Sequence, residues 1–374
     1  MNLPEILFVD DEREVVEPIA SFLQNSGEYE CQIVGFDEAE ECIRTSPPDV
    51  VVLDLVLQSE IDETTPGLEA FDFVWKEHFC PVIIHTGFPE QWVGHMPDHP
   101  FVRIIKKGSN SQAEIQKGLH EFRSHVETMR AAEMHIRRQF AFAVRELAPF
   151  AFTIYPGAGD VNARSDLIVR GGRRRLAALM DDLAVQGDLM FSWEQYIFPS
   201  VGDNLLMGDI LRLRDRDKDD PTSFCIVLTP SCDMVRIGKR AAKVDRVLVS
   251  HCISIEQGLS SIGKGGIRGN KLKDLMGNGF LVQGHFENVL VIPEFIGQIP
   301  HMFANLRDLE LVPWADLDGE TGKYERVASL DSPFRELVAW AYMEIACRPG
   351  LPDRDIEDWC AGIMKTYSGD ISHD

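Results

Sequence analysis

The sequence predicts an α/β N-terminal domain with a doubly wound, five-stranded parallel sheet, then a long connecting helix and a C-terminal α+β domain. Over residues 1–110, short apolar runs alternate with segments of helical periodicity, which is typical of parallel βα units. From Gly208 onward, short apolar runs separated by Asp- and Gly-rich turns indicate an antiparallel sheet or small barrel. Helical patterns close the chain, which predicts terminal helices on the second domain.

The elements of the N-terminal domain follow from its apolar patterning. Val50–Leu53 is a continuous β-branched run, which indicates a strand buried on both faces. The other predicted strands are Ile6–Val9, Val82–His85 and Val102–Ile105, and the predicted helices are Glu14–Leu23 and Leu68–Trp75.

A long helix is predicted over Ser111–Leu147, where apolar residues recur at heptad spacing with one polar interruption at Glu133. Such a helix would be about 55 Å long at ~1.5 Å per residue, which exceeds what one small domain covers. We therefore predict an N-terminal domain over 1–110, a linker helix over 111–148 that dimerises as a coiled coil, and a C-terminal domain over 149–374. The alternative is an ordinary amphipathic helix packed on its own domain. The seam residues are Ile115, Leu119, Phe122, Val126, Met129, Ile136, Phe140, Val144 and Leu147.

The stretch Ala148–Arg170, rich in Pro, Gly and Asn, indicates the boundary at which the C-terminal domain begins. Its predicted strands are Ile210–Leu213, Phe224–Thr229, Val247–Ser250, Phe280–Gln283 and Val289–Ile292. Its predicted helices are Arg173–Val185, a segment from Asp331 to Cys347, and Asp353–Thr366.

Charge and cysteine content restrict the class of protein. The 374 residues carry a formal net charge of -23, and residues 1–130 hold 9 Lys and Arg against 25 Asp and Glu. This balance argues against non-specific binding to nucleic acid or to anionic membranes. No run of 18 apolar residues exists and the N-terminal stretch lacks a basic signal-peptide region, so no membrane association is expected. The eight cysteines form no CxxC pair, which predicts reduced thiols and a cytoplasmic location.

Polar residues follow the predicted parallel strands at the edge where ligands bind in such sheets. Asp10 and Asp11 follow the first strand, Asp54 follows VVVL, Thr86 ends VIIHT and Lys106 ends VRIIK. Three converging carboxylates favour a hard divalent cation, Mg²⁺ before others. A hydroxyl and an ammonium beside them suit the oxygens of a phosphoryl group.

These segments resemble the receiver domain of two-component response regulators. The motifs ILFVDDE, PPDVVVLDL, PVIIHTG and VRIIKKG match that family in order and interval across about residues 3–125. The resemblance implies that Asp54 accepts a phosphoryl group from a sensor histidine kinase. It also implies that the receiver catalyses only its own phosphoryl transfer and hydrolysis.

The resemblance assigns the remaining site residues as well. Asp10, Asp11, Asp54 and the backbone carbonyl of Val56 would bind Mg²⁺, Lys106 would pair with the phosphoryl group, and Thr86 would be the switch hydroxyl. Two positions depart from the family pattern: Lys107 stands where a proline usually follows the lysine, and Arg103 stands where an aromatic switch residue is usual. The acidic stretch between Asp54 and Gly67 is also longer than typical.

The C-terminal domain resembles no family that we identify from its sequence. Cys232, Asp233 and His251 follow apolar strands and could form a thiol nucleophile with its base, and Cys232, His251, Cys252 and His285 could bind zinc. Neither pattern has a recognised spacing, and a buried cysteine beside a turn acid is the simpler interpretation. Zinc is the less expected cofactor.

A basic segment, residues 236–273, holds nine Lys and Arg against Asp245 and Glu256. It reads as a solvated loop or as a surface for an acidic partner, which could be the receiver of the same chain. We predict a response regulator whose output domain does not bind DNA and acts through protein interaction or ligand sensing. The alternative function is a phosphorylation-regulated enzyme with a cysteine- or zinc-dependent site around Cys232 and His251.

Overall fold

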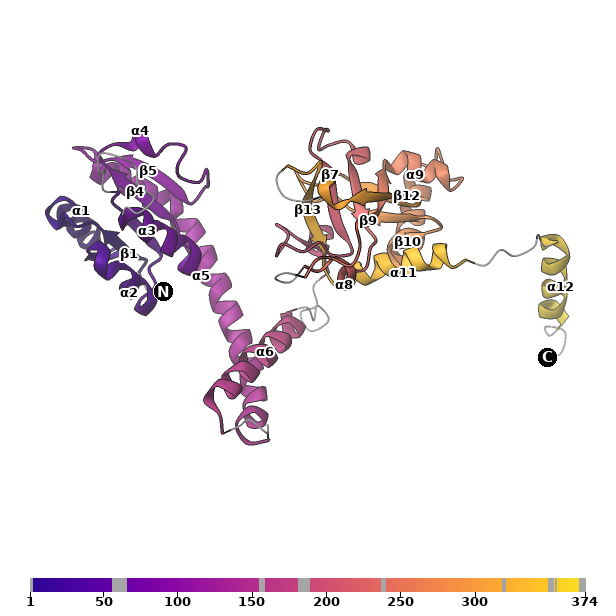
Figure 1. Ribbon diagram of the computed structural model, residues 1–374, viewed down its shortest axis with the longest axis horizontal. Coiled ribbons are helices and arrows are strands. Elements are labelled where there is room, and N and C mark those ends of the chain that lie inside the picture. Colours follow the sequence, from indigo (N-terminus) through magenta and orange to yellow (C-terminus); the bar gives the residue numbers. More distant parts are fainter. Residues whose placement is uncertain are drawn as a thin grey trace. The chain divides into compact units, whose positions relative to one another are not determined.

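The structure is a computed structural model that describes residues 3–55, 66–154, 159–180, 189–236, 240–317, 321–348, 353 and 355–369. The chain divides into two compact units, Met1–Val185 and Gln186–Asp374. Figure 1 labels the helices and strands of both units. The division differs from the predicted boundaries at residues 110 and 149, because the long helix and the helix after it both belong to the first unit.

The first unit contains a five-stranded sheet with the strand order β2-β1-β3-β4-β5, and every neighbouring pair is parallel. This confirms the predicted doubly wound sheet. The strand β2 has no counterpart among the strands predicted individually, since this edge strand alternates exposed and half-buried residues rather than forming an apolar run. The strands are β1 (Glu5–Val9), β2 (Glu30–Val34), β3 (Val50–Leu53), β4 (Val82–Thr86) and β5 (Val102–Lys106).

Helices cover both faces of this sheet, as the alternating pattern predicts. One apolar cluster packs α1 and α5 against one face, and a second packs α2, α3 and the buried ring of Trp92 in α4 against the other. The helices of the unit are α1 (Arg13–Asn25), α2 (Phe36–Thr45), α3 (Pro66–Phe73), α4 (Pro89–Trp92), α5 (Ser111–Pro149) and α6 (Val161–Met180).

The long helix α5 matches the predicted span closely, but its first half is not a linker. Ile115, Leu119, Phe122 and Val126 are buried in the same cluster as β1 and β3. Arg130, one turn further on, forms an ion pair with Asp49. The α5 segment up to about residue 130 therefore completes the first domain, which corrects the predicted boundary at 110. The predicted boundary stretch 148–170 also contains the first half of α6.

The second unit is built on an antiparallel sheet with the order β10-β11-β12-β9-β8-β7-β13-β6, which confirms the predicted antiparallel class. The predicted strand Phe280–Gln283 is wrong: Phe280 lies in a π-helical turn, Met276–Leu281, and stacks on Phe303 at 5.0 Å. The strands are β6 (Tyr196–Ile197), β7 (Asp209–Leu213), β8 (Phe224–Val227), β9 (Arg246–Ile253), β10 (His285–Phe286), β11 (Val289–Ile292), β12 (Met302–Pro313) and β13 (Tyr324–Leu330).

Helices flank this sheet and end the chain. Val338 and Ala341 of α11 are buried in the main apolar cluster of the unit, whereas Leu259 of α9 contributes to a smaller cluster with Phe280 and Phe303. None of the described helices is long and apolar enough to cross a membrane. The helices are α8 (Ser231–Met234), α9 (Ile255–Ser261), α10 (Gly269–Leu275), α11 (Phe334–Ala346) and α12 (Ile356–Gly369).

Candidate functional site

Three carboxylates meet at the carboxyl edge of the parallel sheet. The backbone amide of Asp10 donates to the carbonyl of Val34 at 3.1 Å, and that of Asp54 donates to the carbonyl of Val9 at 2.9 Å. These bonds extend the strand pairing by one residue and fix where each side chain emerges. Asp10, Asp11 and Asp54 each offer a carboxylate oxygen, and these oxygens lie within 4.8 Å of one another. The convergence predicted from the strand ends is therefore present.

The lysine that joins these carboxylates is Lys107, not the predicted Lys106. The Lys107 ammonium lies 2.9 Å from Asp10 Oδ2 and 3.0 Å from Asp54 Oδ2. Lys106 is exposed and lies 3.9 Å from Glu90 on α4. The reason is the alternation of side chains along an extended chain, which sends neighbouring residues to opposite faces. The amide of Lys107 still donates to the Thr86 carbonyl at 2.8 Å, so the alternation continues past the end of β5.

Burial and charge act in opposite directions on this group of side chains. Burial raises the pKa of Asp54; Lys107 lowers it, and the charges of Asp10 and Asp11 raise it further. Burial lowers the pKa of Lys107, but hydrogen bonds and charge from Asp10 and Asp54 outweigh burial and raise it overall. One ammonium thus balances only part of a three-carboxylate cluster, which leaves it suited to a further cation.

The donor set fits Mg²⁺, the cation that the resemblance to receiver domains implies. All three side chains supply carboxylate oxygens, the ligands that this hard cation prefers, and Asp11 is exposed, which leaves a side open to water and substrate. The fourth predicted ligand, the carbonyl of Val56, lies outside the described residues.

Thr86 lies at the end of β4 with its side chain completely buried. Its hydroxyl is 3.5 Å from the carbonyl oxygen of Leu55, and the amide of Phe88 lies 3.4 Å from the same hydroxyl. Both distances are at the long end for hydrogen bonds, so the hydroxyl is held weakly. A weakly held hydroxyl beside Asp54 is free to take a new acceptor at little cost.

Two residues that belong to none of the predicted site positions connect this edge to α5. His85 Nε2 lies 2.9 Å from the hydroxyl of Ser111, the first residue of α5. The same hydroxyl accepts from the amide of Gly108 at 2.8 Å and lies 3.3 Å from the carbonyl of Lys106. Ser111 therefore links β4, the segment after β5 and the start of α5. A serine three residues after a glycine at a helix start is the only sequence signal for this role.

His85 should make the stability of this domain sensitive to acid. Burial, with a smaller contribution from the Lys107 charge, lowers the pKa of His85 to about 4 from the ordinary value of 6.5. Because the folded pKa is depressed, the stabilisation is complete above about pH 6.5 and is lost as pH falls toward 4. A shift of about 1.4 kcal/mol per pKa unit amounts to roughly 3 kcal/mol here. Between pH 6.5 and 4 we therefore expect the free energy of unfolding to fall by roughly 3 kcal/mol less in His85→Gln than in the wild type.

The measurement is urea unfolding of both proteins across this pH range. The raised pKa of Asp54 affects stability in the opposite direction as pH falls. Because Asp54 is present in both proteins, the difference between the two curves of unfolding free energy against pH reports on His85. Parallel curves would show that His85 does not titrate in this window.

The two departures from the receiver pattern change once Lys107 is the site lysine. The residue that follows it is then Gly108, and the residue three places before it is Ile104. Arg103 instead forms an ion pair with Glu121 of α5. Gly67 is a further constraint, since a Cβ there would lie 2.6 Å from the carbonyl oxygen of Asp54. Glycine at this position lets α3 begin directly against the backbone of Asp54.

In the second unit, the predicted cysteine and histidine do not come together. Cys232 lies in α8 with its sulfur 3.7 Å from Asp233, whose carboxylate pairs with Lys243 at 2.9 Å. His251 lies on β9 opposite Cys225 and pairs with Glu310 at 3.0 Å. Cys225 is near the start of β8, whereas Cys232 follows its end. The strand register therefore separates the predicted nucleophile from its predicted base.

The predicted zinc ligands are also separated. Cys252 is fully buried, and as the next residue along β9 it points to the opposite face from His251; burial raises its pKa well above the ordinary range. His285 lies on β10, with β11 and β12 between it and β9. That distance is roughly 14 Å at about 4.8 Å per strand. Among the described residues, the one cluster with metal-ligand geometry is that of Asp10, Asp11 and Asp54.

The basic segment 236–273 is not one surface. Arg236 stacks over the Trp314 ring at 4.2 Å before β9, whereas Arg268 pairs with Glu256 at 3.6 Å after it. Between these two contacts the chain passes through the eight residues of β9, a strand about 26 Å long.

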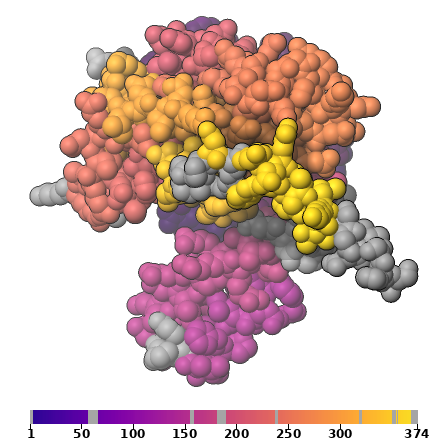
Figure 2. All heavy atoms as spheres, turned by 90° about the vertical axis from the view of Figure 1, so that its right-hand side faces the viewer, coloured from indigo at the N-terminus to yellow at the C-terminus, as the bar shows by residue number. Residues whose placement is uncertain are grey.

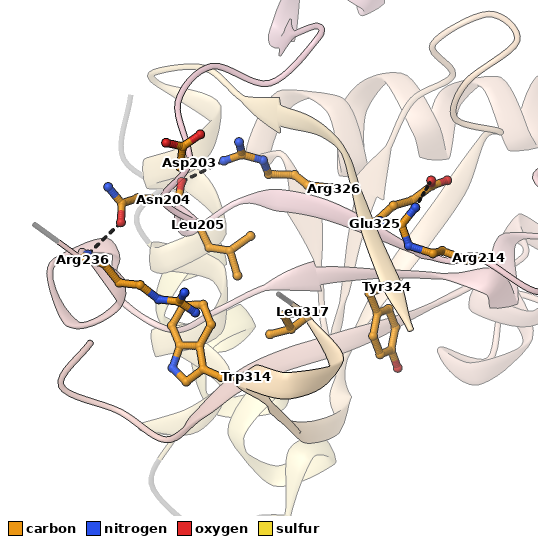
Figure 3. Close-up of a pocket in the computed structure, with 10 residues that line it drawn as sticks. All are labelled: Asp203, Asn204, Leu205, Arg214, Arg236, Trp314, Leu317, Tyr324, Glu325 and Arg326. Atoms are coloured by element: carbon orange, nitrogen blue, oxygen red, sulfur yellow. Dashed lines mark hydrogen bonds and ion pairs between the residues drawn. The ribbon is translucent and has the colours of Figure 1, made fainter. Parts of the chain in front are cut away.

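Arg236 instead borders a hollow of about 190 Å³ (Figure 3). Two other arginines line this hollow, and both bond to neighbouring protein groups. Arg214 pairs with Glu325 at 3.2 Å, and Arg326 donates to the carbonyl of Asn204 at 2.8 Å. The hollow by itself identifies no ligand.

The fold and the acidic edge together define the first unit as receiver-like. No protein-family model matches the chain. A stretch of 83 residues is 32% identical to the regulatory protein VanR of Enterococcus faecium; it covers 22% of this chain and 34% of VanR, so the chain spans about a third of that relative's length.

Solved structures of receiver domains are also similar. The PhyR receiver domain of Erythrobacter litoralis is 20% identical, with a TM-score of 0.26, over 32% of this chain and 92% of that one. The activated receiver domain of RstA from Klebsiella pneumoniae is 23% identical, with a TM-score of 0.26, over 31% and 97%. The N-terminal third of the chain resembles the receiver domains of response regulators, as its four motifs predict, and the C-terminal unit is unrecognised in these matches.

Proposed function

We propose that the protein is a two-component response regulator that accepts a phosphoryl group on Asp54 from a sensor histidine kinase. The observation that supports this most is the Lys107 ammonium, which lies within 3.0 Å of both Asp10 and Asp54 at the edge of three converging carboxylates. A lone turn carboxylate would need neither a second acid nor a half-buried ammonium beside it. This set suits transfer of an anionic group to a carboxylate.

In the proposed reaction, a carboxylate oxygen of Asp54 attacks phosphorus, the P–N bond to the kinase histidine breaks, and the imidazole leaves. Asp54 must be ionised to attack, and Lys107 favours the ionised form against the effect of burial. Lys107 also lies where it can hold an oxygen of the transferred group. When bound at Asp10, Asp11 and Asp54, Mg²⁺ would neutralise negative charge on the phosphoryl oxygens.

The two adjacent lysines offer a matched test of this site. We expect Lys107→Ala to slow phosphorylation by a small-molecule phosphodonor by on the order of 100-fold, because a half-buried charge partner of the developing negative charge is lost. Lys106→Ala should change the rate less than about twofold, since Lys106 is exposed. The rates are measured by phosphate-affinity electrophoresis with Mg²⁺ present. Equal rates for the two variants, or a slower Lys106→Ala, would contradict the assignment of Lys107.

Phosphorylation would be transmitted along β4 and β5. The buried Thr86 hydroxyl would leave its long contacts to Leu55 and Phe88 and donate to a phosphoryl oxygen. The same strand carries His85, which contacts Ser111 at the start of α5. A shift at the end of β4 would thereby reach α5 through a packed side chain and not through solvent.

The second unit would be an output domain that acts by protein interaction or ligand sensing in the cytoplasm, without binding DNA. The low basic content of the chain, 37 Lys and Arg against 60 Asp and Glu, supports this reading. The alternative, an enzyme centred on Cys232 and His251, has no support in the register of β8 and β9. The dimer proposed through residues 111–148 would use the part of α5 beyond Arg130, because the helix up to Arg130 packs against the parallel sheet.

A further inference from the structure

The last helix of the chain, α12, has one apolar side and is exposed along its whole described length (yellow in Figure 2). The exposed fraction is 65% for Ile363 and 70% for Tyr367. An isolated helix of 14 residues is only marginally stable in water, and most helices in proteins depend on packing of an apolar face. The helix therefore needs a surface to pack on. Its apolar stripe consists of Ile356, Trp359, Cys360, Ile363, Met364 and Tyr367.

The second unit has an apolar groove beside α11, the helix that precedes α12. The groove has a volume of about 510 Å³ and lies between α11 and the loop of residues 281–284. Leu281, Val282 and Trp340 border it, with exposed fractions of 62%, 75% and 52%. Large apolar side chains that are exposed together mark a surface for binding.

The walls of this groove are fixed by the packing beneath them. Val338 anchors α11 in the main apolar cluster of the unit. Gly284 has a φ of +79°, and a Cβ there would overlap the Leu337 side chain, so glycine lets the loop close against α11. The Trp340 ring contacts the buried His285 ring at 4.8 Å, which holds the tryptophan at the rim. The groove is therefore preformed.

We propose that α12 docks in this groove of its own chain, so that α11 and α12 form an antiparallel helical pair. Nine residues, 347–355, join the two helices. They can span up to about 30 Å, whereas the axes of packed helices lie about 8–10 Å apart. A short connection also keeps α12 near the groove at an effective concentration in the millimolar range, an advantage that no separate partner has.

The apolar residues of the two helices coincide in this arrangement. Trp340 lies six residues before the end of α11, and Ile363 lies seven residues after the start of α12. At ~1.5 Å per residue, both are about 10 Å from the connection, so Ile363 would lie at the level of Trp340. Tyr367, one turn further, would lie near Leu337. The stripe of α12 is thus long enough to cover the groove.

Docking of α12 would control access to the groove. A partner of the second unit would have to displace α12, and it would have to present an amphipathic helix with apolar residues at the same spacing. The docking goes beyond the function proposed above. It does not depend on phosphorylation of Asp54, so the two proposals can fail separately.

Charge distinguishes this docking from attachment of α12 to some other surface. Glu336 borders the groove, and α12 carries Glu357 and Asp358, so the contact relies on apolar burial and not on charge attraction. Added salt should leave it intact, because screening removes only repulsion. Attachment of these acidic residues to a basic surface would weaken as salt rises.

The test is the rate at which Cys360 is alkylated in the full chain, followed by peptide mass spectrometry. Cys360 belongs to the apolar stripe, so docking should protect its thiol. Cys232 is exposed on another helix and serves as a reference in the same molecule. We expect alkylation of Cys360 to be slow, unaffected by salt and independent of protein concentration, since the contact forms within one chain.

Two valines provide the variant and its matched control. Val282→Asp places a charge at the rim of the groove and should speed alkylation of Cys360 at least about tenfold, because α12 then leaves the groove more often. Val201→Asp should leave the rate unchanged, since Val201 is 73% exposed and does not border the groove. Cys252, which is fully buried, should stay unreactive in both variants and so report that the unit is folded.

Three results would overturn the proposal. The first is equal alkylation of Cys360 in the native chain and in Val282→Asp. The second is protection that is lost as salt rises, which would place α12 on a basic surface. The third is protection that appears only at high protein concentration, which would place it on a second copy. Loss of phosphodonor labelling at Asp54 in a chain whose Cys360 is protected would count against the proposed function alone.

Discussion

Asp54→Asn is expected to abolish phosphorylation, with a loss of at least 100-fold in the amount of phosphoprotein formed with a small-molecule phosphodonor and Mg²⁺. The amide cannot act as the nucleophile, and it also removes one of the two carboxylates that hold Lys107. The measurement is intact-protein mass spectrometry, which detects the phosphoryl adduct directly.

Asp72→Asn provides the matched control for this variant. Asp72 is an exposed acid on α3 that pairs with Lys76, and its loss removes the same charge without touching the site. It should be labelled like the wild-type chain. Equal labelling of Asp54→Asn and Asp72→Asn would mean that another residue accepts the phosphoryl group.

A fragment of residues 1–110 is expected not to fold, whereas a fragment of residues 1–131 should fold cooperatively. The shorter fragment lacks Ile115, Leu119, Phe122 and Val126, all of them buried against the sheet. Their burial contributes about 6–12 kcal/mol at roughly 1.5–3 kcal/mol each. That is comparable to the whole stability of a typical domain, about 5–15 kcal/mol.

Thermal unfolding followed by circular dichroism distinguishes the two fragments. The longer fragment also keeps the ion pair between Arg130 and Asp49 and should melt in a single transition. A cooperative transition for residues 1–110 would show that α5 is a linker from its first residue, as the sequence alone suggested.

The parallel sheet and its acidic edge were open to prediction because their signals are local. Val50–Leu53 is apolar at every position, which a strand buried on both faces requires, and Asp54 follows it directly. Since the carboxyl ends of parallel strands share an edge, the position of an acid after each strand is enough to bring Asp10 and Asp54 together.

The regular apolar spacing of α5 did not predict what its apolar side contacts. The same heptad pattern runs through Leu119 and Ile136, yet Leu119 is buried in the first domain and Ile136 is exposed. Spacing along a helix specifies which residues share a face, and the partner of that face is set by the rest of the chain. The Pro- and Gly-containing stretch before α6 similarly indicated a break but not a helix that packs back against α5.

By itself, the sequence determined the doubly wound sheet, the antiparallel class of the second unit and the identity of the three carboxylates. Tertiary structure decided which of two adjacent lysines pairs with these carboxylates. The segment VRIIKKG contains both lysines, and only the direction of the side chains past β5 brings Lys107 to the carboxylates. Tertiary structure also separated Cys232 from His251, which strand register sets and residue types do not. The physical reason is the same in both cases: composition and period are properties of a segment, whereas the contact between two side chains depends on the path of the backbone between them.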